Sequence, residues 1–241
     1  MLAHTMARGN FEQQLHQLQE KLLILSSKVT GNLTLAANIL YRADAQEAHR
    51  LIAADEAINQ AQVQIEQMCL ALIATQQPRA TDLRLITAVS AIASELERIN
   101  DYAKGIAKIS LSFTPIGLGS EVAILREMGD QLQGMLTGAI DAFIERDVPQ
   151  ACAIHAADQA IDILYQQIQR ELLAYLMTHV EVMENATKLM WAAHNYERAG
   201  DRIGNICERV VFLVTGEIIE LPYDEWLMQI TPEVSYVSPP D

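Results

Sequence analysis

The sequence predicts an all-α protein made of two tandem three-helix bundles that are related by internal duplication. Half of its 241 residues are hydrophobic but only 5% are aromatic, a composition typical of helix bundles rather than of β-sandwiches or barrels. Apolar residues recur three and four positions apart over long segments, which is the period of an amphipathic helix. A break rich in glycine and proline separates two sets of three such segments, so we expect two similar halves.

The first two helices are predicted from continuous apolar stripes. The first extends from residue 11 to about residues 41–44 and follows residues 1–10, which we expect to form a flexible N-terminus. The second extends over residues 45–75. Pro78 ends it, because the proline ring removes a backbone donor and disfavours a helical conformation at the preceding residue.

The third helix completes the first repeat, which covers residues 11–110. Its expected N-cap is Thr81, whose side-chain oxygen can accept a hydrogen bond from the first turn. Asp82 follows, and its charge suits the positive end of the helix dipole. Residues 111–119 contain one proline and two glycines and interrupt the apolar period, so we expect them to link the two repeats.

The second repeat, residues 120–216, follows the same plan. Its helices are expected over about residues 120–146, 147–178 and 181–215. Ser120 and Asp147 are the expected caps of the first two, and Gly216 stands where a C-cap glycine belongs. Residues 217–241 carry four prolines, and we expect an irregular tail there.

The charge of the chain limits its partners. It carries 31 acidic residues against 17 Lys and Arg, a net charge of −14. Nucleic-acid binding uses clustered basic residues to neutralise phosphates, so we expect no nucleic-acid partner. Cations and basic protein surfaces are the favoured partners of such an acidic chain.

The three cysteines and the hydropathy pattern indicate a cytoplasmic protein. Cys69, Cys152 and Cys207 are far apart in apolar helical segments, so we expect them to be reduced and buried. The N-terminus lacks the pattern of a signal peptide, and no segment has the roughly 18 apolar residues of a membrane span. No direct membrane insertion is expected.

Pairs of polar residues spaced four positions apart are the candidate functional feature. The pairs are Glu97 and Asp101, Glu197 and Asp201, Asp158 and Asp162, and Asp55 with Asn59. The spacing places both members of a pair on one helix face. The pairs fall in the last helix and in the middle helix of each repeat, at offsets of 100 and 103 residues, which is the register of a duplication.

Antiparallel helices can bring such pairs opposite one another, as metal sites in bundles do. Up to four converging carboxylates in each half would suit divalent or trivalent cations such as iron, manganese, zinc, magnesium or calcium. For any single pair, a solvated helix face is the simpler interpretation. The duplicated register favours metal binding.

Two other classes of function remain as alternatives. A carboxylate-bridged metalloenzyme of the ferritin type would use Glu-x-x-His pairs, and none of the six histidines lies three residues after a glutamate. The sequence also lacks a Gly-rich phosphate loop and a G-x-S-x-G elbow, so we expect no enzyme and see no direct phosphate site. The second alternative is a metal-free helical scaffold whose acids are solvated.

Several segments resemble the PhoU family. They are residues 76–85, 93–103, 196–208 and 211–217. The two E-x-x-x-D motifs in duplicated context make the resemblance specific, and it extends over roughly residues 11–217. It implies two tandem three-helix bundles, usually in a homodimer. It also implies E/D-x-x-x-D motifs that bind multinuclear iron or other metals, with zinc, manganese or magnesium as further candidates.

The resemblance further implies a non-enzymatic cytoplasmic regulator of phosphate homeostasis. Such a protein negatively modulates high-affinity phosphate uptake and phosphate-starvation two-component signalling. Its implied partners are the cytoplasmic subunit of the phosphate ABC transporter and a sensor histidine kinase. Binding to these partners would place it peripherally at the inner face of the membrane.

Two residues depart from the family pattern. The motif positions that match are Glu97, Asp101, Glu197, Asp201, Asp158, Asp162 and Asp55. Asn59 stands where the family usually has a second acid, and an amide oxygen can ligate without contributing charge. The first half is therefore expected to bind metal more weakly or to hold fewer ions. Asn100 occupies the place of Gly200 in the later repeat.

Overall fold

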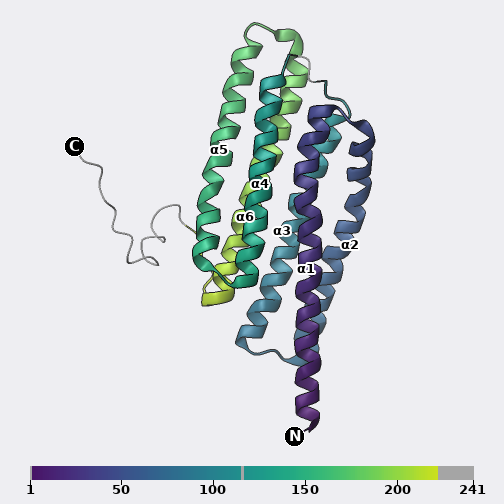
Figure 1. Ribbon diagram of the computed structural model, residues 1–241, viewed down its shortest axis with the longest axis vertical. Coiled ribbons are helices and arrows are strands. Elements are labelled where there is room, and N and C mark those ends of the chain that lie inside the picture. Colours follow the sequence, from purple (N-terminus) through teal and green to yellow (C-terminus); the bar gives the residue numbers. More distant parts are fainter. Residues whose placement is uncertain (1, 115–116, 222–241) are drawn as a thin grey trace, which may run out of the picture.

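The computed structural model describes residues 2–114 and 117–221, and these form a set of long helices (Figure 1). The helices are α1 (Leu2–Arg42), α2 (Ala45–Gln76), α3 (Ala80–Ser110), α4 (Gly119–Glu145), α5 (Val148–Leu176) and α6 (Met183–Thr215), with the short 3₁₀ helix η1 (Val180–Val182) before α6. The described ranges contain no strand. The predicted all-α class is confirmed.

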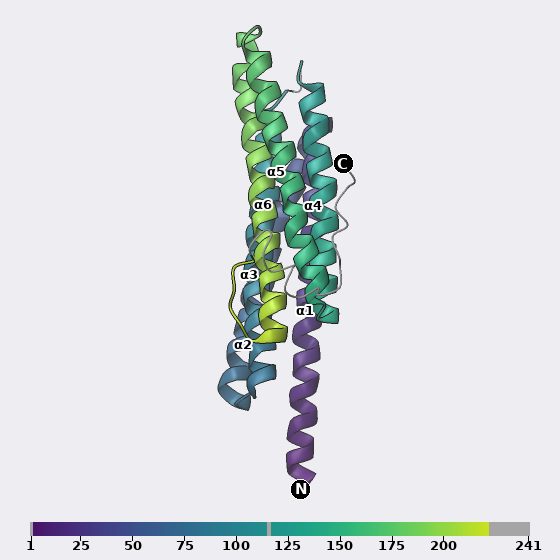
Figure 2. The ribbon, with the colours of Figure 1, turned by 90° about the vertical axis from the view of Figure 1, so that its left-hand side faces the viewer.

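The helices form two three-helix bundles that lie side by side (Figures 1 and 2). In the first bundle α1, α2 and α3 pack on one another, and in the second α4, α5 and α6 do so. The bundles meet along two pairs of helices, because α1 packs against α4 and α3 packs against α6. This leaves α2 and α5 on the outer sides of the molecule, each packed within its own bundle.

The apolar stripes predicted from the sequence become the core. Leu18, Leu22 and Val29 of α1 are fully buried, as their spacing of four and seven residues predicts for one helix face. Where the bundles meet, the side chain of Tyr196 in α6 is also fully buried. Its hydroxyl donates a 2.5 Å hydrogen bond to the backbone carbonyl of Leu33 in α1. This bond satisfies the one polar group of a large buried side chain.

The helix ends agree with the sequence at two of the predicted caps. The carboxylate of Asp147 accepts a 2.9 Å hydrogen bond from the backbone N–H of Gln150 and begins α5. Gly216 ends α6 with a φ of 83°, a left-handed conformation that glycine adopts without steric cost. Asp44 caps α2 in the same way as Asp147, through the backbone N–H groups of Gln46 and Glu47.

Three predicted helix starts are wrong. Thr81 and Ser120 lie inside helices that begin at Ala80 and Gly119, and neither helix has a side-chain cap. The first helix begins at Leu2 rather than near residue 11, so residues 2–10 are helical where we expected a flexible segment. No proline separates this segment from the helix that follows, so the helix continues toward the N-terminus without a break.

The remaining expectations concern the cysteines, membrane spans and tail. Cys69, Cys152 and Cys207 are free and buried, as predicted. Within the described part of the chain, no helix is long and apolar enough to cross a membrane. After α6, residues 217–221 have no regular secondary structure. The rest of the expected irregular tail lies outside the described residues.

Candidate functional site

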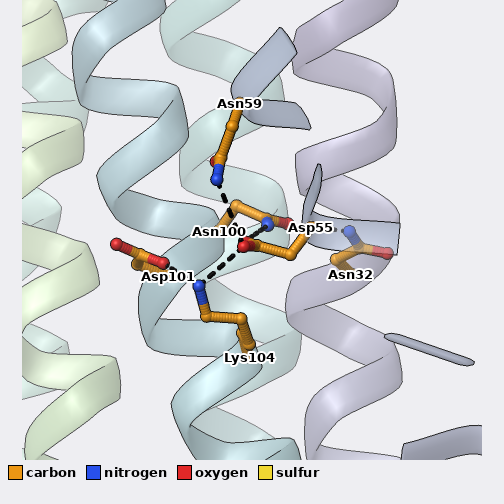
Figure 3. Close-up of polar contacts among 6 residues, drawn as sticks. All are labelled: Asn32, Asp55, Asn59, Asn100, Asp101 and Lys104. Carbon is orange, nitrogen blue, oxygen red and sulfur yellow. Dashed lines mark hydrogen bonds and ion pairs between the residues drawn. The ribbon is translucent and has the colours of Figure 1, made fainter. Parts of the chain in front are cut away.

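The polar pairs of the first repeat come from the neighbouring helices α2 and α3, and Figure 3 shows three of the four residues, Asp55, Asn59 and Asp101. Asp55 and Asn59 come from α2, and Glu97 and Asp101 come from α3. Burial raises the pKa of Glu97, and the negative charges of Asp101 and Asp55 raise it further. The predicted residues therefore lie within electrostatic range of one another.

A lysine that the sequence analysis missed lies among these acids. The ammonium Nζ of Lys104 lies 2.7 Å from Asp55 Oδ2 and 2.5 Å from Asp101 Oδ1 (Figure 3). Burial alone would lower the pKa of Lys104, but hydrogen bonds to both carboxylates outweigh it and raise the pKa. The ammonium is thus held in its charged form. Its position three residues after Asp101 was the available sequence signal.

Two asparagines complete this network. Asn100 Nδ2 donates a 2.9 Å hydrogen bond to Asp55 Oδ1, and Asn32 of α1 donates a 2.7 Å bond to Asn100 Oδ1. Asn59 Nδ2 lies 3.3 Å from Asp55 Oδ2 and also donates to it. Asp55 is only 8% exposed, yet both of its oxygens have donors. A buried carboxylate with this set of partners is well stabilised.

The polar pairs of the second repeat come from α5 and α6. Asp158 and Asp162 lie on α5, and Glu197 and Asp201 lie on α6. Burial raises the pKa of Asp158 to about 7, and the charges of Asp162, Asp201 and Glu197 add to the effect. Burial and the charge of Asp201 likewise raise the pKa of Asp162. The four acids therefore act on one another electrostatically, as their spacing predicted.

Asp158 has a different environment from its counterpart Asp55. It is 7% exposed, and its Oδ1 atom has no hydrogen-bond partner among the described residues. Two of the donors to Asp55 are the side chains of Asn100 and Lys104. The equivalent positions in the second repeat, 100 residues later, are Gly200 and Gly204, which have no side-chain donor. A buried carboxylate oxygen without a donor is costly.

Gly200 lets α6 approach the Asp158 carboxylate closely. A Cβ atom at Gly200 would lie 2.1 Å from Asp158 Oδ1, a separation that no side chain can occupy. Two basic side chains contact the α6 acids of this cluster: Arg198 Nη1 lies 2.9 Å from Asp201 Oδ2, and His194 Nδ1 lies 3.3 Å from Glu197 Oε2. Within the part of the chain that the structure describes, Asp158 Oδ1 has no such contact.

The chemistry of the second cluster fits a cation, whereas that of the first does not. The second cluster has four carboxylates, the ligand type that hard or borderline metals prefer, and one of them has a buried oxygen without a donor among the described residues. In the first cluster the lysine ammonium already contacts two of the three acids. No group of three or more Asp, Glu, His or Cys side chains in the described ranges is arranged as a metal site, so metal binding stays a prediction.

Both clusters lie in segments that match a known protein family. The model of the PhoU domain matches residues 22–110 and 125–210, one match for each three-helix bundle. The chain belongs to the PhoU family. The two PhoU domains include all eight residues of the polar pairs.

Relatives of known name are similar over most of their length. The phosphate-specific transport system accessory protein PhoU homolog of Streptococcus pneumoniae serotype 4 is 34% identical over 214 residues, which are 89% of this chain and 99% of that protein. The accessory protein PhoU of Escherichia coli strain K12 is 31% identical over 209 residues, or 87% of each chain. The similarity therefore extends well beyond the motifs.

Two crystal structures share the fold. The phosphate transport system regulatory protein PhoU from Streptococcus pneumoniae superposes with a TM-score of 0.81 at 34% identity, covering 88% of this chain and all of that one. PhoU from Pseudomonas aeruginosa superposes with a TM-score of 0.80 at 33% identity, covering 86% of this chain and all of that one. The paired three-helix bundles described above are thus a PhoU fold.

Proposed function

We propose that this chain is a regulatory adaptor of phosphate transport, not an enzyme, and that it binds metal through the four acids of α5 and α6. In this role it restrains high-affinity phosphate uptake and phosphate-starvation two-component signalling. Its membership of the PhoU family and the names of its relatives as accessory proteins of phosphate transport support the regulatory role. The observation that carries the metal-binding part is Asp158, a buried carboxylate with an orphaned oxygen among three further acids.

Neutralising the acids would change how α5 and α6 interact. A bound divalent or trivalent cation, such as iron or manganese, supplies positive charge to the cluster. Asp158 and Asp162 belong to one helix, and Glu197 and Asp201 belong to the other, so their mutual repulsion opposes close packing of the pair. With that repulsion removed, the side chains of the cluster hold the two helices in one relative position. The outer helix α5 then presents a fixed surface to a partner.

The proposed partners are the cytoplasmic subunit of the phosphate ABC transporter and the sensor histidine kinase. The net charge of −14 favours basic surfaces on those partners. The chain would act as a homodimer in the cytoplasm and reach the inner face of the membrane only through them. Regulation would follow from which partner the metal-loaded surface holds.

Co-purification together with a starvation-responsive reporter tests this proposal. Cells without the native protein would express the wild type, Asp158→Asn/Asp201→Asn, or Asp141→Asn, whose acid is exposed on α4. At high phosphate, the wild type and the Asp141 variant are expected to repress the reporter and to co-purify with the transporter subunit. The double variant is expected to lose both properties.

Two results would contradict parts of the proposal. If reporter output is the same with and without the wild-type protein, the regulatory role is refuted. If the double variant still represses the reporter and retains its partner, the dependence on metal is refuted and a metal-free scaffold explains the family role.

A further inference from the structure

The two repeats differ in the groups that contact the aspartate of their middle helix. In the first repeat, Asp55 receives donors on both carboxylate oxygens, from Asn100, Asn59 and Lys104. In the second repeat, Oδ1 of Asp158 has no donor in residues 2–114 and 117–221. Because the duplicated positions are otherwise in register, this difference points to different roles for the two clusters.

The ammonium of Lys104 lies where a bridging cation would lie. It contacts Asp55 on α2 and Asp101 on α3 (Figure 3), so it joins the two helices through two carboxylates. The Lys104 side chain is 19% exposed, which means that most of its stem packs against the protein. The ammonium is therefore a fixed part of the bundle rather than a mobile surface charge.

We infer that Lys104 is the built-in cation of the first repeat, so that only the α5–α6 cluster of this chain takes up metal. The inference rests on the metal binding proposed above for the second repeat. It concerns the first repeat, where the network of Asn32, Asn100 and Lys104 leaves no free carboxylate oxygen on Asp55.

Displacement of this lysine by a metal ion would meet two obstacles. The ion would have to remove an ammonium held by two carboxylates, and that charge-assisted contact is among the stronger polar interactions in proteins. If the lysine stayed in place, the positive ammonium would repel the incoming cation at short distance. Asn59 would not restore the balance, because its amide adds no negative charge.

In the second repeat the described residues contain no ammonium that bridges the two helices as Lys104 does, because Arg198 contacts Asp201 within its own helix, α6. Gly204 stands at the position equivalent to Lys104, and Gly200 stands at the position equivalent to Asn100. The second repeat has four acids at these positions, where the first repeat has three acids and one ammonium. In the first bundle Asp55 and Asp101 thus share a permanent cation, whereas the acids of the second bundle gain a bridging cation only when they bind one.

Removal of the lysine tests this inference. We would measure bound manganese and thermal melting, with EDTA and with Mn²⁺ as the probe, for the wild type, Lys104→Ala and Lys108→Ala. Lys108 lies one turn further along α3 and is exposed, so it controls for the loss of one positive charge. In EDTA, Lys104→Ala is expected to melt at a lower temperature than the wild type, because Asp55 loses its ammonium partner.

Manganese is expected to restore much of that loss. Lys104→Ala should bind more manganese than the wild type, and the additional manganese should disappear when Asp101→Asn is added to it. Lys108→Ala should behave as the wild type does in both measurements. The inference would be overturned if Lys104→Ala bound no more manganese than the wild type. It would also be overturned if the two proteins had the same melting temperature in EDTA.

A second variant decides the question even if Lys104→Ala does not fold. Asp101 is 46% exposed at its side chain, so Asp101→Asn alone is a mild change. In the wild-type background it should leave the manganese content unchanged, whereas Asp201→Asn should reduce it. Loss of manganese from Asp101→Asn would overturn the inference. A wild type that binds no manganese would instead refute the proposed metal binding, and the gain of manganese by Lys104→Ala would still test the role of the lysine.

Discussion

Replacement of Asp158 by asparagine is expected to stabilise the metal-free protein at pH 8 but not at pH 4.5. Burial, followed by the charges of three neighbouring acids, raises the pKa of Asp158 from 3.8 to about 7. The native state therefore binds this proton more tightly than the unfolded state does. Stability falls as the pH rises from about 4 to about 7, and the full loss is present above pH 7. Asparagine does not titrate and avoids that loss.

The size of the effect follows from the difference between the two pKa values. A difference of about 3 pKa units corresponds to about 4 kcal/mol in the free energy of unfolding. Solvent screening reduces this to roughly 2–4 kcal/mol, because part of the cluster is exposed. We therefore expect the advantage of Asp158→Asn over the wild type to grow by about 2–4 kcal/mol between pH 4.5 and pH 8.

Urea denaturation in EDTA at these two pH values measures the effect. Asp141→Asn is the control, because that carboxylate is exposed on α4 and its replacement should leave the pH dependence unchanged. Saturating Mn²⁺ should reverse the order at pH 8, since the wild type alone keeps the full set of acids. An advantage of Asp158→Asn that is equal at both pH values would refute the reasoning.

Four further substitutions test other parts of the structure. Tyr196→Phe removes a buried hydrogen bond between the bundles and is expected to cost about 0.5–1.5 kcal/mol in urea denaturation, the net value of one hydrogen bond, because the Leu33 carbonyl lies inside α1 and keeps its helical donor. Gly200→Ala places a Cβ atom against the carboxylate of Asp158 and should lower both stability and manganese binding, measured by titration calorimetry. Gly134→Ala, with open space around its Cβ, should instead stabilise by about 0.5–1 kcal/mol. Asp147→Ala removes the cap of α5 and should lower the melting temperature, at a cost of about 1 kcal/mol.

The fold was largely predictable because its signals are local. Apolar residues that recur every three and four positions identify the helices, and the proline after α2 and the glycine after α6 mark helix ends. None of these patterns depends on the tertiary structure. The starts of α3 and α4 were not predictable in the same way. Thr81 and Ser120 are good capping residues, but in both cases the helix begins one residue earlier, at Ala80 and Gly119.

The polar pairs were predictable, but the difference between the two clusters was not. Spacing and duplication place Asp55, Asp101, Asp158 and Asp201 on facing helices, and the structure brings each half's residues within electrostatic range. The spacing of Lys104 three residues after Asp101 indicates a contact within α3, but it does not indicate the contact with Asp55. Its role depends on the direction of its side chain toward α2, which only packing determines.

The sequence also did not predict which helices of the two bundles pack against one another. The contacts of α1 with α4 and of α3 with α6 join residues far apart in the chain, such as Leu33 and Tyr196. Periodicity identifies the buried face of a helix but not the helix that covers it. The long-range partner of Tyr196 therefore came from the structure.

The most direct test of metal binding is elemental analysis of manganese-reconstituted protein after gel filtration in metal-free buffer. The wild type and Asp141→Asn are expected to retain manganese, and Asp158→Asn/Asp201→Asn is expected to lose it. Equal manganese in the wild type and the double variant, or none in either, would contradict the assignment of a metal site to the acids of α5 and α6.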